Sequence, residues 1–141
     1  MSDTENIKIG KNVIQIEAQA VLAIADRINE QFETAVKTIL DCKGRLIVLG
    51  IGKSGLISQK IASTMASTGT PAHFVHPGDA FHGDLGMITK EDVILMISNS
   101  GETHELVQII PAIRKKGVPI IGMIGREKST LYNGVDVMRN P

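Results

Sequence analysis

The stretch LMISNSGETHEL, residues 95–106, decides the fold class. It begins as an apolar run that is typical of a buried strand, and at Ser98 it changes into hydroxyl, amide and glycine residues followed by a glutamate. A helical pattern starts at Thr103 and continues to Lys116. A strand that ends in small polar residues and leads into a helix is typical of α/β proteins with a parallel sheet.

The same pattern recurs on both sides of this stretch. Short apolar runs rich in β-branched residues predict strands, and helical patterns separate them. We expect strands at 45–50, 72–76, 92–97, 119–124 and 136–139, helices at 56–68 and 103–116, and a helical turn at 130–134. We therefore predict an α/β fold with a five-stranded parallel sheet of order 2-1-3-4-5, flavodoxin-like, flanked by helices.

A long amphipathic segment precedes the first strand. Apolar residues recur every three or four positions from Ile7 to Leu40, which predicts a long helix that ends near Gly44. Such a stripe is larger than one helix needs to cover a single sheet. We therefore expect part of it to pack on a second subunit, which predicts a homo-oligomer.

Length and composition exclude several classes of protein. The 141 residues predict one domain, residues 1–141, and 15 basic residues balance 15 acidic ones. This balance disfavours nucleic acid or an anionic membrane as a partner, and no apolar run has membrane-spanning length, so we predict a cytoplasmic protein. Cys42 is the only cysteine, so no disulfide forms within the chain. The sequence stops at Pro141, close to the fifth predicted strand, and we expect a fragment of a longer protein.

Two loops carry the candidate binding residues. GIGKSG, residues 50–55, follows the first predicted strand, and SNSGET, residues 98–103, follows the third. In the order 2-1-3-4-5 these strands flank the point where ligands bind. Each loop leads into a helix whose first amides favour an anion, so we predict a phosphate cradle there. The alternative is that Ser100 or Thr103 only caps its helix.

The same loops also resemble nucleotide motifs. GIGKSG matches the dinucleotide fingerprint, but no acidic residue follows the second strand at the required distance. A P-loop requires a glycine where this chain has Ile47, so we reject that motif.

Three charged or titratable residues are candidates for chemistry. Lys53 lies between two glycines in the first loop, where it either reaches over the crevice or is only solvated. Glu102 either stabilises the dipole of its own helix or acts as an acid or base on the ligand. His82, between Phe81 and Gly83, either contacts the ligand or hydrogen-bonds to backbone. The spacing of the histidines and acids in this region matches no standard zinc pattern.

Three segments carry a resemblance to a known family. GIGKSG, STGTPAHFVHPGDAFHGDLGMI and ISNSGET resemble the sugar isomerase (SIS) domain of bacterial D-arabinose 5-phosphate isomerases. The resemblance covers nearly the whole chain, and HPGDAFHGDLGM is its most specific part. Family members continue past the fifth strand to a further acidic residue and a histidine, and many carry CBS domains. These parts are absent from the printed sequence.

The resemblance implies interconversion of D-ribulose 5-phosphate and D-arabinose 5-phosphate, for 3-deoxy-D-manno-octulosonate in lipopolysaccharide or capsule. It implies a homotetramer, an enediol intermediate and no cofactor. It places Lys53 and Glu102 in the active site with His82 close by. The alternatives are a non-catalytic sugar-phosphate-binding module and an isomerase of another sugar phosphate. We assign phosphate binding to Gly52, Ser54, Ser98, Asn99, Ser100, Gly101 and Thr103.

Overall fold

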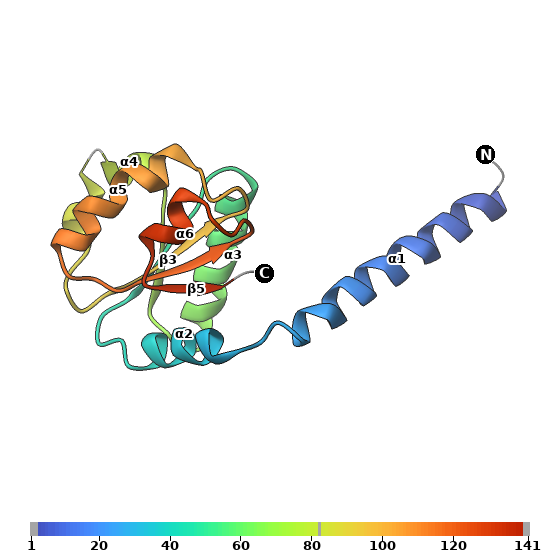
Figure 1. Cartoon of the computed structure of the whole chain (residues 1–141), viewed down its shortest axis with the longest axis horizontal. Helices are drawn as coiled ribbons and strands as arrows, with labels where there is room; N and C mark the ends of the chain where they lie inside the picture. The colour runs from blue at the N-terminus through green and yellow to red at the C-terminus, as the bar shows by residue number, and fades with distance from the viewer. Residues whose placement is uncertain (1–2, 82, 140–141) are drawn as a thin grey trace.

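The structure, a computed structural model, describes residues 3–81 and 83–139. Its strands form a parallel sheet in the order β2-β1-β3-β4-β5 (Figure 1). They are β1 (Leu46–Leu49), β2 (Ala72–Val75), β3 (Val93–Ser98), β4 (Ile120–Ile124) and β5 (Val137–Arg139). The predicted α/β class and its parallel sheet are confirmed.

Helices cover both faces of this sheet. One face packs against α2 (Glu30–Leu40) and α3 (Lys53–Ser67). The other face packs against α4 (Pro77–Phe81), α5 (His104–Lys115) and α6 (Thr130–Gly134). A 3₁₀ turn at Asp84–Met87 follows α4. The sheet is therefore apolar on both sides, which explains the unbroken apolar runs in the sequence.

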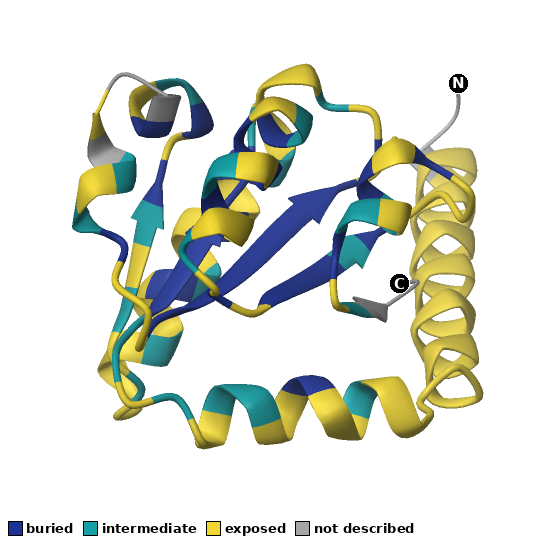
Figure 2. Ribbon diagram, turned by 60° about the vertical axis from the view of Figure 1, so that its left-hand side comes forward, coloured by how far each residue is buried: buried dark blue, intermediate teal, exposed yellow. Residues whose placement is uncertain are grey.

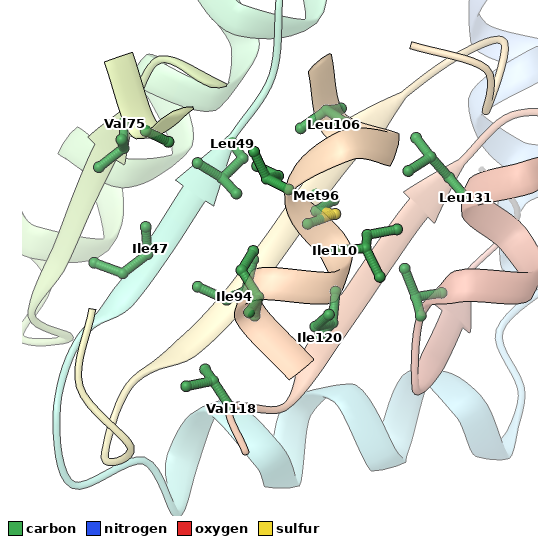
Figure 3. Packing of buried hydrophobic residues seen from close by; sticks show 14 of the residues in the cluster. Ile47, Leu49, Val75, Ile94, Met96, Leu106, Ile110, Val118, Ile120 and Leu131 are labelled. Carbon is green, nitrogen blue, oxygen red and sulfur yellow. The ribbon is translucent and has the colours of Figure 1, made fainter. Parts of the chain in front are cut away.

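The central strand β3 is buried at every position. Ile94 and Met96 point to the α5 side, where they pack with Leu106 and Ile110 (Figure 3). Leu95 belongs to the cluster on the α2 and α3 side. Each fully buried aliphatic side chain contributes about 1.5–3 kcal/mol of hydrophobic free energy, so the core holds the sheet in one register.

The N-terminal segment differs from the prediction of one long helix. It forms two helices, α1 (Asp3–Ala25) and α2, with a break before Glu30. Asn29 takes an extended conformation and its side chain accepts a hydrogen bond from the Gln31 amide at 3.0 Å. An asparagine that caps a new helix ends the old one, and two acidic residues in the first turn of α2 favour this start. The regular apolar spacing hid this cap.

Helix α1 projects away from the body of the protein (Figure 1). Residues 4–25 are exposed throughout, as the uniform colour of this helix in Figure 2 shows. Leu22, for example, keeps 72% of its surface exposed. The apolar stripe of α1 is therefore not covered by any other described part of the chain. None of the helices among the described residues is long and apolar enough to cross a membrane.

Two smaller differences lie near the predicted loops. Helix α3 begins at Lys53, three residues before the predicted start at Leu56. The HPGDAFHGDLGM segment, for which no helix was predicted, contains α4 and the 3₁₀ turn. Pro77 opens α4, as expected for a residue whose fixed φ suits the first helical position.

Candidate functional site

The two predicted loops leave the sheet side by side. Strands β1 and β3 are neighbours in the sheet, and their register pairs Leu49 with Met96. The loops that follow therefore start at the same edge, from strands about 4.8 Å apart. This confirms the predicted arrangement of loops 50–55 and 98–103 at the carboxyl edge of the sheet.

The first loop makes a tight turn into α3. Gly52 caps the helix with φ 60°, a conformation that glycine adopts easily. A side chain on Gly50 would place its Cβ 2.8 Å from the Ser54 carbonyl oxygen, so glycine allows the helix to approach the strand. Lys53 is exposed and Ser54 is half-buried at the start of the helix.

The second loop is held together by its own hydroxyl groups. The Ser98 oxygen accepts a hydrogen bond from the Gly101 amide at 3.0 Å and lies 2.8 Å from the Thr103 hydroxyl. Ser98 is only 2% exposed. The Ser100 oxygen accepts from the Glu102 amide at 3.2 Å. Ser98 therefore shapes the loop from inside, whereas Asn99 and Ser100 face solvent.

Neither helix that follows these loops has a side-chain cap. Thr103 is the cap residue of α5, but its hydroxyl bonds to Ser98 and not to a helix amide. Helix α3 likewise starts without a side-chain cap. The first amides of both helices are thus available to a ligand, and their dipoles favour an anion.

Glu102 contacts another helix. One carboxylate oxygen accepts a hydrogen bond at 2.8 Å from the amide of Thr130, the first residue of α6. Hydrogen bonding from the Thr130 side chain and amide, together with the positive charge of Arg126, lowers the pKa of Glu102. Glu102 therefore stays negatively charged at neutral pH and can accept hydrogen bonds from sugar hydroxyls.

A third loop, residues 125–129, borders the site and was missed by the sequence analysis. The Gly125 amide donates to the Ser98 carbonyl oxygen at 3.1 Å, and the Leu131 amide donates to the Gly101 carbonyl oxygen at 3.0 Å. The sequence did indicate that this loop borders the site, because it follows the fourth predicted strand, which lies next to the third in the predicted strand order.

The remaining candidate, His82, lies outside the described residues. In the same segment, His76 is exposed and its Nδ1 accepts a hydrogen bond from the Gly78 amide at 3.1 Å. Within residues 3–81 and 83–139, no three His, Cys, Asp or Glu side chains form a group that could hold a metal ion.

Fold and site together define an α/β domain in which two loops at the carboxyl edge of the sheet lead into helices without side-chain caps. The sequence model of the SIS domain family matches residues 39–138. The chain belongs to the SIS domain family.

Named relatives are similar over almost the whole chain. It is 48% identical over 128 residues to the arabinose 5-phosphate isomerase KdsD of Yersinia pestis, which covers 91% of this chain and 39% of that protein. The protein of that name from Pseudomonas aeruginosa is 47% identical over 131 residues, 93% of this chain and 40% of that protein. The chain thus spans about two fifths of the length of these curated relatives.

Solved structures match as well. A protein of Escherichia coli CFT073 in complex with arabinose 5-phosphate has a TM-score of 0.92 and 39% identity, over 99% of this chain and 74% of that chain. A Bacteroides fragilis protein, described as a putative phosphosugar isomerase involved in capsule formation, has a TM-score of 0.89 and 38% identity, over 95% of this chain and 72% of that chain.

Proposed function

We propose that this chain forms the sugar-phosphate site of an aldose-ketose isomerase that interconverts D-ribulose 5-phosphate and D-arabinose 5-phosphate. The observation that carries this proposal is the 48% identity, over 91% of the chain, to an arabinose 5-phosphate isomerase. The similar structure in complex with arabinose 5-phosphate supports the same ligand. We further propose that the pathway is 3-deoxy-D-manno-octulosonate synthesis.

In this proposal the two uncapped helices hold the phosphate. Their first amides, the Ser100 hydroxyl and the exposed backbone at Gly52 offer donors to an anion without an arginine in either loop, and Gly101 lets the second loop pack closely on Ser129. The buried Ser98 and the Thr103 hydroxyl keep the second loop in shape. Ser54 and Asn99 are the remaining residues of the two loops to which we assign phosphate binding.

The sugar end then lies within reach of Lys53 and Glu102. Isomerisation removes a proton from C2 of the aldose and protonates its carbonyl oxygen, which gives an enediol. The O2 hydroxyl then loses its proton and C1 gains one, which gives the ketose. Lys53 stabilises the enediolate oxygen as a fixed charge, Glu102 holds hydroxyls or carries a proton, and His82 is the third residue to which we assign a catalytic role.

The exposed stripe of α1 supports a homo-oligomer. Val13, Val21 and Leu22 are 45–72% exposed, and Leu56 and Ile57 add exposed apolar surface on α3. Water disfavours so many exposed apolar side chains, so a second copy of this chain is the proposed cover. Leu22→Glu reduces the mass measured by analytical ultracentrifugation, and Gln19→Glu on the same helix is its control. An unchanged mass in Leu22→Glu would contradict this interface.

Proton NMR of D-ribulose 5-phosphate mixed with the chain tests the activity directly. Appearance of D-arabinose 5-phosphate signals is the expected result, and the Lys53→Ala variant serves as the reference for background conversion. Binding of the sugar phosphate without turnover would instead identify a non-catalytic binding module. Turnover of a different sugar phosphate alone would replace the proposed substrate.

A further inference from the structure

Residues 125–130 are attached to the SNSGET loop at several points. Hydrogen bonds join Gly125 to Ser98 and Leu131 to Gly101. Gly101 has φ 66°, and a Cβ atom on it would overlap the Ser129 side chain. The two loops therefore pack against each other without room for a side chain, so the start of α6 has a defined position relative to the SNSGET loop.

The Ser129 side chain also fixes the start of α6 through two hydrogen bonds of its own. Its oxygen accepts from the Tyr132 amide at 3.3 Å, and its hydroxyl donates to the Arg126 carbonyl oxygen at 2.9 Å. The amide of Thr130 is not used by this cap, and it points to Glu102 Oε1 at 2.8 Å.

We propose that the first amide of α6 holds the Glu102 carboxylate in position for the sugar phosphate, which makes Thr130 a positioning residue of the site. The inference rests on the proposed function for the ligand. An exposed glutamate samples several rotamers, whereas a charge-assisted hydrogen bond to a fixed backbone amide selects one. The ligand then meets a carboxylate whose direction is already set.

Thr130→Pro removes this donor, together with the Thr130 hydroxyl, and leaves the backbone of α6 able to form. Proline lacks the amide hydrogen, and the first position of a helix tolerates it because that amide makes no intrahelical bond. Proline also requires an extended residue before it, and Ser129 already has φ −92° and ψ 168°. The substitution removes the side-chain hydroxyl as well, so Thr130→Val, which lacks the hydroxyl but keeps the amide, is measured beside it to isolate the amide hydrogen bond.

Glu30→Pro is the matched control. Glu30 is likewise the first residue of a helix that follows an extended cap residue, Asn29 at φ −141° and ψ −171°. It lies on α2, outside the SNSGET and 125–130 loops. Thermal unfolding of both proline variants shows whether proline at such a position affects folding by itself.

Calorimetric titration with D-arabinose 5-phosphate, in a double-mutant cycle with Glu102→Ala, is the first readout. In the wild-type background, Thr130→Pro weakens affinity about tenfold, as expected for the loss of a hydrogen bond to a charged group. In the Glu102→Ala background, Thr130→Pro causes no further loss of affinity. Glu30→Pro leaves affinity unchanged. Equal affinity of Thr130→Pro and wild type, or additive losses in the cycle, would overturn the proposal.

Carbon-13 NMR of the Glu102 carboxyl group, without ligand, is the second readout. Loss of the Thr130 hydrogen bond raises the pKa of Glu102, while Arg126 acts on it in both proteins, so the difference isolates Thr130. An unchanged pKa would overturn the hydrogen bond itself. If the wild type fails to bind the pentose phosphate, the proposed function fails, and this titration still decides whether α6 holds Glu102.

Discussion

The two edges of the sheet differ in whether their polar groups find hydrogen-bond partners inside the protein. At the amino edge, Asp92 is 1% exposed and its carboxylate accepts from the amides of Arg45 at 2.7 Å and Thr89 at 2.8 Å. The Arg45 guanidinium lies 3.4 Å away and also donates to the Met87 carbonyl oxygen. At the carboxyl edge, α3 and α5 begin without side-chain caps.

This difference separates stability from binding. Donors that a buried carboxylate satisfies inside the protein are unavailable to a ligand, and they contribute to folding. Helix amides without a cap contribute less to folding and can bind an anion. We therefore expect substitutions at the amino edge to change the free energy of unfolding, and substitutions of exposed residues at the carboxyl edge to change mainly ligand binding and turnover.

Asp92→Ala gives the largest expected effect. It leaves the buried amides of Arg45 and Thr89 without an acceptor and the Arg45 charge without its partner, which costs about 3–5 kcal/mol of unfolding free energy. Urea unfolding followed by circular dichroism measures this loss. Glu33→Gln, which removes an exposed ion pair with Lys37, is the control and changes stability by less than about 1 kcal/mol. Similar values for the two variants would contradict the structural role of Asp92.

Gly101→Ala affects both properties. The positive φ and the overlap with Ser129 together cost about 2–4 kcal/mol. Gly117→Ala is the matched control, because Gly117 has φ 69° and open space around its Cβ position. The difference between the two unfolding free energies measures the packing against Ser129. We expect only Gly101→Ala to weaken sugar-phosphate binding as well.

Lys53→Ala removes the positive charge from the carboxyl edge. We expect turnover to fall by about 10²-fold, because a preorganised charge at the enediolate oxygen is lost. The melting temperature stays close to that of the wild type, since Lys53 is exposed. The exposed Lys60→Ala is the control in the isomerase assay. An intact rate in Lys53→Ala would remove its catalytic role.

Ser100→Ala removes one donor of the proposed phosphate cradle. We expect affinity for D-arabinose 5-phosphate to fall about tenfold, with little change in thermal stability. The exposed Ser63→Ala on α3 is the control. Calorimetric titration measures both, and unchanged affinity in Ser100→Ala would count against the cradle.

The smallest expected difference concerns acid unfolding. Burial raises the pKa of Asp92, but hydrogen bonds from Thr89 and Arg45 outweigh it and lower the pKa below its usual 3.8. Its contribution to stability is thus complete above pH 3.8 and is lost as the pH falls through the folded-state pKa. Stability curves in this range are steeper for wild type than for Asp92→Asn. Parallel curves would contradict the lowered pKa.

The sheet could be predicted because each strand is a run of apolar residues between glycine or polar residues. Val93–Ser98 is such a run, and the prediction placed it within one residue. The break at Asn29 was missed because the apolar spacing continues through it, and only the cap residue and the acidic first turn of α2 marked it.

The site was predictable in its position and less so in its details. Parallel topology alone brings loops 50–55 and 98–103 to one edge. The contact of Glu102 with Thr130 depends on backbone conformation 28 residues further along the chain, which no local pattern contains. The inward direction of the Ser98 hydroxyl likewise depends on the turn that brings Gly101 and Thr103 back to it.

The break before α2 also separates two parts of the chain whose backbone amides are protected from hydrogen exchange in different ways. The core begins at α2, and residues 4–25 bury nothing against it. In an isolated subunit the amides of α1 exchange with deuterium through local fraying of the helix. The amides of β3 exchange only when the whole domain unfolds. Under the proposed association through α1, exchange in α1 reports association and exchange in β3 reports folding, within a single mass-spectrometry experiment.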